Sequence, residues 1–421
     1  MNPRHELALV LDFGSINNQQ AAKIIRNLGV YCEVLPASTA TENIAARNPK
    51  AVILQRGPQF PGAVASPAPC HAEALGVPLL DLRDAPCDAA TLEKFLMKTA
   101  GFKADWTTAE FVGDAVESIR ARVGGDNVLL GLSGGVDSSV CALLLQKAVG
   151  RQLTCVFVDH ACMRKNEPRE IAETFGGRLG VNLVHVDAQD RFLAALKGVI
   201  DPEQKRKIIG ELFIRVFEEE ARKLGRLDYF AQGTIYPDII ESGKEGGKNV
   251  KSHHNVGGLP ARIDFKGIVE PVKHLFKDEV RKVGVFLGLP AALAQRQPFP
   301  GPGLAVRCVG ELTRGRLDLL READAIFREE IQAAGLTDAP GQYFAVLTDT
   351  RSTGVRDDAR AYGHTVALRA VCTNDFMQAR AARLPWELLE KISARVTTEI
   401  PDVNRVVYDI TAKPPATIEW E

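Results

Sequence analysis

The sequence predicts an α/β fold built around doubly wound parallel sheets, and three observations lead to that class. Apolar runs of strand length alternate with helical patterns over residues 1–101 and again over residues 102–296, the order found in parallel sheets covered by helices. Residues 297–421 carry long helices and separate strands, an α+β pattern. With 421 residues, of which 45% are hydrophobic, the chain can build cores for two or three such domains.

The first alternation is typical of half of a doubly wound sheet. A continuous apolar run, Leu7–Phe13, precedes a helical pattern over Asn17–Asn27. We expect further strands at Tyr31–Leu35, Ala51–Leu54 and Val77–Leu82, a Pro/Ala-rich loop at Pro58–Pro69, and a closing helix at Asp88–Lys98. Phe102–Thr107 has the composition of a linker, so the first boundary is placed at residue 101.

The second alternation is organised around Val128–Ser139, where an apolar strand meets a polar loop and then a helical pattern. The loop residues are Ser133, Gly134, Gly135, Val136, Asp137, Ser138 and Ser139. Glycines let the backbone N–H groups approach an anion, and the serine hydroxyls and the helix N-terminus favour phosphate. Asp137 would repel phosphate unless a cation lay between them, so the loop implies Mg²⁺. It lacks the Gly-Lys-Ser/Thr ending of a P-loop and the Gly-x-Gly-x-x-Gly of dinucleotide enzymes.

Ligands of parallel sheets bind at the carboxyl ends of the strands, where this loop and the end of the predicted strand Leu153–Val158 both fall. The charged segment Asp201–Glu220 is a candidate mobile lid, with a solvated basic face as the alternative. Gly243–Gly258 has the composition of a loop that orders on a ligand. Other expected elements are a strand at Asn182–Val186, helices at Phe111–Val123, Glu167–Leu179, Lys277–Leu287, Glu311–Ala334 and Trp386–Thr398, and strands at Gln342–Leu347, Thr365–Val371 and Arg405–Ile410.

Composition limits the classes of partner. A formal net charge of −1 gives no global field for nucleic acid or membrane, so any anion site must be local. We find no apolar run long enough to span a membrane and no apolar signal core near the start, and we therefore expect a soluble cytoplasmic protein. The 8 cysteines are scattered without metal-ligand spacing, which favours reduced, mostly buried thiols.

The loop at Ser133–Ser139 resembles the pyrophosphate loop of the N-type ATP pyrophosphatases, and a series of further blocks narrows the resemblance to glutamine-hydrolysing GMP synthetases. These blocks are Val158–His160, Arg164–Glu167, Lys205–Gly210, Gln232–Asp238, Ser252–Asn255, Phe276–Arg281, Arg296–Gly303 and Lys413–Glu421. The resemblance covers the chain from about Phe102 to Glu421. It implies an ATP pyrophosphatase domain at 102–296 and a C-terminal dimerisation and XMP-binding domain at 297–421, hence a homodimer.

The resemblance also implies a reaction. ATP would adenylylate XMP at O2 with release of pyrophosphate, and ammonia would then displace AMP to give GMP. The loop residues and Val158 would bind ATP, with Asp137 as the Mg²⁺ ligand. Asp137, Lys205, Lys207 and Lys277 would be catalytic, since phosphoryl transfer needs cations more than a covalent nucleophile. XMP would be bound by Arg164, Asn255, Arg356, Lys413 and Glu419.

The first part departs from the family, whose amidotransferase domain is about twice as long and carries a nucleophilic Cys with a later His and Glu. Gln55–Pro58 stands where Ser-Gly-Gly-Pro would form the oxyanion strand, and Arg83 occupies the nucleophile position. Cys70 beside His71 is a poor replacement, because adjacent loop residues rarely point at each other. We therefore expect residues 1–101 to be a degenerate remnant without glutaminase activity. The synthetase would take free ammonia, or ammonia from a separate glutaminase.

A second departure concerns the substrate. In the segment Gly354–Tyr362, Asp357 replaces a glycine of the family pattern, and Gln295 stands where the family tends to have Trp. If the loop needs a positive φ at that glycine, Asp would adopt it with strain. These changes leave two alternatives open: an ATP pyrophosphatase acting on a different purine-like substrate, and a non-catalytic paralogue that binds a partner.

Overall fold

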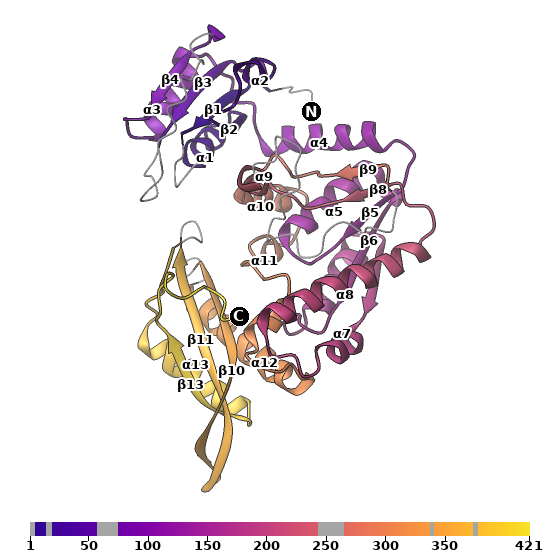
Figure 1. Ribbon diagram of the computed structural model, residues 1–421, viewed down its shortest axis with the longest axis vertical. Helices are drawn as coiled ribbons and strands as arrows, with labels where there is room; N and C mark the ends of the chain where they lie inside the picture. Colours follow the sequence, from indigo (N-terminus) through magenta and orange to yellow (C-terminus); the bar gives the residue numbers. More distant parts are fainter. Residues whose placement is uncertain (1–4, 14–18, 57–74, 243–264, 337–340, 374–377) are drawn as a thin grey trace.

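The computed structural model describes residues 5–13, 19–56, 75–242, 265–336, 341–373 and 378–421, which form three sheets along the chain (Figure 1). The first sheet lies at one end of the molecule, the second at the centre and the third at the far end of the chain. This is the predicted arrangement of two parallel α/β parts followed by an α+β part. Pro58–Pro69 and Gly243–Gly258 lie outside the described residues. No helix within those described residues is long and apolar enough to cross a membrane.

The first sheet is parallel, with the order β2-β1-β3-β4. Its strands are β1 (Ala8–Asp12), β2 (Cys32–Pro36), β3 (Ala51–Gln55) and β4 (Leu79–Leu82), and its helices are α1 (Gln20–Asn27), α2 (Thr41–Ala45) and α3 (Ala89–Glu93), which continues as a π-helical segment, Lys94–Thr99. β1 and β3 read as continuous apolar runs because both of their faces are buried. The cluster on one face includes Tyr236 and Phe276, so the first part packs against the central part.

The central sheet is also parallel, with the order β7-β6-β5-β8-β9. Its strands are β5 (Val128–Gly131), β6 (Leu153–Asp159), β7 (Leu183–Asp187), β8 (Tyr229–Ala231) and β9 (Gly267–Val269). Alternate residues of β5 point to opposite faces of the sheet and enter different cores. Val128 and Leu130 pack with α4 (Thr108–Val123), α5 (Val136–Val149) and α10 (Lys277–Phe286). Leu129 packs instead with α7 (Gln189–Leu196) and α8 (Pro202–Lys223).

Short elements complete the central part and bring the chain back over the sheet. They are α6 (Glu167–Ile171) with the π-helical segment Ala172–Arg178, α9 (Tyr236–Ser242), α11 (Ala291–Ala294) and the 3₁₀ segments Gly150–Gln152 and Gly303–Arg307. The single helix expected at Glu167–Leu179 is therefore divided. Its second half is wound more widely, and it contains the adjacent glycines Gly176 and Gly177, whose lack of side chains leaves the backbone freer to depart from α geometry.

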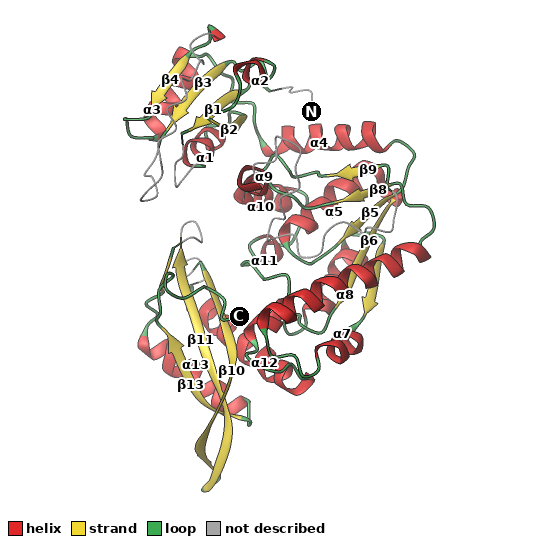
Figure 2. Ribbon diagram, in the orientation of Figure 1, coloured by secondary structure: helices red, strands yellow, loops and turns green. Residues whose placement is uncertain are grey.

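The last part combines α12 (Arg314–Ala333) and α13 (Trp386–Glu399) with a mixed sheet. Its strands are β10 (Gln342–Arg356), β11 (Ala359–Thr373), β12 (Ala379–Ala381) and β13 (Val403–Asp409). β10 and β11 are each 15 residues long, much longer than expected, and their hairpin projects from the body of the molecule (Figure 2). The turn between them is Asp357–Asp358, with φ of +48° and +57°, so the positive φ expected at Asp357 is present.

Candidate functional site

The loop between β5 and α5 is folded into an anion-binding shape by its own side chains. Ser133 N donates to Ser138 Oγ (3.2 Å), the two serine hydroxyls lie 3.0 Å apart, and Gly135 N faces Ser133 Oγ at 3.3 Å. Gly134 has a φ of +77°, and a Cβ there would lie 2.4 Å from Ile171 Cδ1. Glycine is therefore required both for the backbone conformation and for the close approach of α6. The 14-residue helix α5 begins at once, so its positive end faces the loop.

Asp137, in the first turn of α5, gives this loop a negatively charged carboxylate. Lys277, the first residue of α10, places its Nζ 2.5 Å from Asp137 Oδ2. The other carboxylate oxygen, Asp137 Oδ1, is buried and has no hydrogen-bond partner in the part of the chain that the structure describes. An orphaned carboxylate oxygen beside a phosphate loop fits Mg²⁺, which is usually held by one or two carboxylates together with substrate phosphates. Among the described residues there is no group of three or more His, Cys, Asp or Glu side chains that could hold a metal alone.

Two segments without an assigned role in the sequence analysis close around the same loop. Gly233 packs so tightly on α5 that a Cβ there would lie 3.2 Å from Ser138 N. Arg296 reaches the carbonyl of Gly134 at 3.5 Å and pairs with the buried Glu167. Both residues lie in sequence blocks used for the family resemblance, but neither block revealed which loop it would touch. Val158 is buried near the carboxyl end of β6, the strand next to β5.

The structure does not bring Lys205 to the phosphate loop. Its side chain is 0% exposed, and its ammonium donates to the carbonyl of Cys308 at 2.9 Å and to the side chain of Glu421. These partners supply the buried ammonium with hydrogen bonds and a counter-charge. In this structure Lys205 therefore joins α8 to the end of the chain. The proposed lid Asp201–Glu220 consists of the N-cap residue and most of the regular helix α8, whose inner face is packed in the core. Lys207 is exposed on the same helix.

Three residues expected to bind XMP fall into two neighbouring groups. Arg164 is 3% exposed, and none of its guanidinium nitrogens has a hydrogen-bond partner among the described residues, where the carboxylate of Asp324 lies 3.9 Å away. Burial lowers the pKa of Arg164 to about 10, although the acidic groups nearby oppose the shift. Its guanidinium stacks on Phe299 at 4.0 Å, and Arg307 approaches the same ring at 5.3 Å. A buried, unsatisfied cation of this kind is suited to bind an anion.

The second group is the C-terminal tail. Glu419 accepts a two-pronged interaction from Arg307, at 2.9 and 2.8 Å, and Arg307 is 1% exposed. Lys413 lies on the same tail, where its backbone forms a bridge with Ala379. The buried Arg369 donates to the carbonyls of Thr411 (2.6 Å) and Thr417 (3.1 Å) and so fixes the tail on both sides of Lys413. Sequence reasoning missed Arg307 and Arg369, because an arginine inside a strand or a 3₁₀ turn carries no periodic signal.

The remaining two residues of the expected XMP set are not added to this cluster. Arg356 lies at the outer end of the β10–β11 hairpin, where it donates to the carbonyl of Thr397 at 2.7 Å. It therefore lies apart from the tail within this chain, and its expected contact with the base stays a prediction. Asn255 lies outside the described residues.

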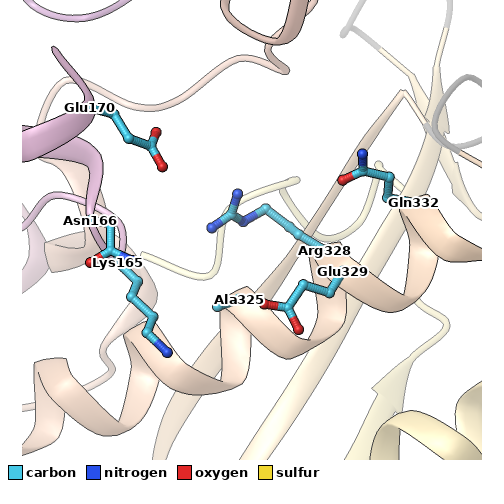
Figure 3. Close-up of a pocket in the computed structure, with 7 residues that line it drawn as sticks. All are labelled: Lys165, Asn166, Glu170, Ala325, Arg328, Glu329 and Gln332. Carbon is cyan, nitrogen blue, oxygen red and sulfur yellow. The ribbon is translucent and has the colours of Figure 1, made fainter. Parts of the chain in front are cut away.

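A cavity of about 230 Å³ lies between the segment that follows Arg164 in the chain and α12. Figure 3 shows Glu170 and Arg328 pointing into this space from opposite sides. Its lining residues are Lys165, Asn166, Glu170, Ala325, Arg328, Glu329 and Gln332. The mixed charge of this lining selects neither anions nor cations.

Comparisons with known proteins place these elements in context. Residues 107–219 match the family model "NAD synthase", and residues 329–420 match "GMP synthase C terminal domain". A GMP synthase (glutamine-hydrolyzing) of Acetivibrio thermocellus is 46% identical over 512 residues, covering 99% of this chain and 100% of the relative. A protein of the same description from Ruminiclostridium cellulolyticum is 43% identical over 509 residues, with coverage of 99% and 100%.

A third relative, from Symbiobacterium thermophilum and with the same description, is 58% identical over 330 residues, which are 78% of this chain and 64% of the relative. The alignment with the Acetivibrio protein spans 512 positions, whereas this chain has 421 residues, so at least 91 positions (512 less 421) have no counterpart here. This difference in length is consistent with the shortened first part.

Proposed function

This chain belongs to the glutamine-hydrolysing GMP synthase family, and on that premise we propose that it is a C–N ligase that forms GMP from XMP, ATP and free ammonia. The observation that carries the proposal is a complete phosphate loop whose Asp137 pairs with Lys277. In the same chain, Arg83 stands where the amidotransferase nucleophile is expected. The first feature supports ATP cleavage, and the second opposes glutamine hydrolysis.

The phosphate loop is the proposed site of ATP cleavage. Backbone N–H groups from Ser133 to Gly135 and the N-terminus of α5 would hold the triphosphate. XMP O2 then attacks the α-phosphorus, the bond to the bridging oxygen breaks, and pyrophosphate leaves with the electron pair. Lys277, which is held beside Asp137 in the first turn of α5, would neutralise charge on that leaving group. Mg²⁺, which Asp137 would hold, supplies further neutralisation when bound.

The buried guanidinium of Arg164 and the tail residues are the proposed XMP site. An anionic nucleotide would accept the hydrogen bonds that the guanidinium of Arg164 does not make to any of the described residues. Glu419, held by Arg307, would present carboxylate oxygens to donors on the purine, and Lys413 would add a cation. Ammonia then attacks C2, AMP leaves with the electron pair, and the surplus proton passes to solvent. Arg356 and the altered Asp357 lie at the hairpin tip, so this chain offers no specific observation in favour of a different purine.

The degenerate amidotransferase position supports ammonia dependence. Arg83 follows β4 directly and forms a two-pronged pair with Asp81 at 2.9 and 2.5 Å, while its guanidinium lies 5.3 Å from the Phe13 ring. A guanidinium is always charged and cannot act as an acyl nucleophile. Ammonia would therefore come from solution or from a separate glutaminase. We further propose a cytoplasmic homodimer joined through residues 297–421, and sedimentation velocity showing only the single-chain mass would contradict the dimer.

The test is to measure AMP and GMP formation from ATP, Mg²⁺ and XMP, once with ammonium chloride and once with glutamine. We expect turnover with ammonium alone, and Arg83→Ala should leave its rate unchanged. Equal turnover with glutamine would refute the loss of glutaminase activity. Absence of turnover with both nitrogen sources would refute the synthase assignment, provided that a full-length relative is active in the same buffers.

A further inference from the structure

The first part of the chain carries a buried arginine on helix α1, and this arginine contacts the central part. Arg26, in the last turn of α1, is 5% exposed. Its guanidinium lies 4.6 Å from the Tyr31 ring and 4.5 Å from the Trp106 ring, and it donates to the carbonyl of Cys32 at 2.7 Å. It also donates to Glu279 of α10, at 3.3 Å to Oε1. The arginine therefore joins the remnant, the linker and the central domain in one cluster.

Glu279 is the residue through which this cluster reaches the ATP site. Its Oε2 accepts from Phe276 N at 2.8 Å, which caps the N-terminus of α10, and its Oε1 accepts from Trp106 Nε1 at 2.6 Å. The first residue of the helix thus capped is Lys277, whose ammonium meets Asp137 of the phosphate loop at 2.5 Å. Displacement of Glu279 would move this helix end, and the lysine with it.

A second tie leads from the remnant to the opposite side of the loop. Val34 N, in β2, donates to the Tyr236 hydroxyl at 2.5 Å, and the Tyr236 ring is buried in the same core as β2. Tyr236 begins α9, three residues after Gly233. Gly233 packs directly on Ser138 and Asp137, the residues at the start of α5. The remnant therefore holds both segments that flank the phosphate loop.

From these contacts we propose that the remnant, although without glutaminase chemistry, is a scaffold for the ATP site. Arg26 and Tyr236 are positioning residues: Arg26 fixes Lys277 through Glu279, and Tyr236 fixes the Gly233 segment. The inference rests on the ATP-site part of the proposed function. The inference gives the remnant a role in the synthetase, since shifts of an ångström in a positioned cation can be costly to binding and rate.

The test is the equilibrium affinity of the full chain for Mg²⁺ and α,β-methylene-ATP, an analogue that cannot be cleaved at the α,β bridge, measured by calorimetry. We expect Arg26→Gln to weaken binding about fivefold, Arg26→Lys to restore part of the loss, and Tyr236→Phe to weaken binding about twofold. Arg47→Gln is the matched control, because Arg47 pairs with Glu33 inside the remnant, and its affinity should equal that of the wild type. Apparent KM for XMP should stay within twofold in all variants.

A merely structural Arg26 would lower the melting temperature and leave nucleotide affinity unchanged below it, and that result would overturn the proposal. If Arg26→Gln does not fold, Tyr236→Phe decides, since it removes one oxygen atom from a buried ring; unchanged affinity in that variant also overturns the proposal. Because binding is measured without XMP or ammonia, a wild-type chain that binds the analogue but makes no GMP would refute the synthase assignment separately.

Discussion

Replacing Gly134 by alanine should disturb the phosphate loop by a predictable amount. A left-handed φ such as the +77° found here costs an L-residue about 1–2 kcal/mol. The new Cβ would also lie 2.4 Å from Ile171 Cδ1, and Ile171 is 0% exposed, so its side chain must leave its rotamer at a cost of about 1 kcal/mol. The sum is about 2–3 kcal/mol.

The matched control is Gly135→Ala. Gly135 has a φ of −72°, and the nearest atom to its added Cβ is Ser133 Oγ at 3.4 Å, an ordinary contact. We expect this variant to change the unfolding free energy of the apo protein by less than about 0.5 kcal/mol. The two substitutions add the same atoms in the same loop, so their difference isolates the backbone conformation and the Ile171 contact.

The assay is thermal unfolding of both apo variants, followed by binding of α,β-methylene-ATP to Gly134→Ala. A loss of about 2 kcal/mol lowers the melting temperature by roughly 4–8 °C in a domain of this size. If the strain also deforms the bound loop, affinity should fall about 30-fold. Equal melting temperatures for Gly134→Ala and Gly135→Ala would refute the claim that this loop depends on the positive φ of Gly134.

Three further predictions follow from other contacts. Lys277→Met should lower kcat/KM for ATP by about a hundredfold in the ammonium assay, because the charge beside Asp137 is lost; an effect below threefold would remove Lys277 from the proposed chemistry. Glu419→Ala should cost about 3 kcal/mol of stability in urea unfolding, because it leaves the buried Arg307 unpaired, and a loss below 1 kcal/mol would contradict that reading. Burial lowers the pKa of His274 from 6.5 to about 3, so the unfolded chain binds a proton that the folded chain does not, and stability falls as pH drops below 6.5. Denaturant unfolding between pH 7 and pH 5 should show that the wild type loses at most about 2 kcal/mol of unfolding free energy, and His274→Asn should reduce this loss. An identical pH dependence in the variant would contradict the role of His274.

The parts that could be predicted from the sequence are those determined by neighbouring residues. The strand, loop and helix around Ser133 are confirmed, because an apolar run and a Ser/Gly loop adjoin each other in the chain. The outer halves of β10 and β11 were missed because they cover no core on either face, so the alternation that reveals a strand is absent. Their pairing depends on the cross-strand register and on the turn at Asp357 instead.

The site was predictable only as a set of segments, not as a set of contacts. Lys277 and Asp137 are separated by 140 residues and Arg307 and Glu419 by 112, so only the tertiary fold pairs them. The basic cluster at residues 205–207 shows the same limit. Its members look equivalent in sequence, and Lys205 alone is fully buried, because the end of the chain returns to it.

That return has a consequence for the order in which the protein can fold during synthesis. The ammonium of Lys205 is buried against the carboxylate of Glu421, which is added 216 residues later. At about 5–20 residues per second, the ribosome needs roughly 10–40 s to supply that partner. Until then the ammonium of Lys205, near the start of α8, must remain hydrated. The central sheet can form early, but the contact between α8 and the tail forms only after translation has reached Glu421.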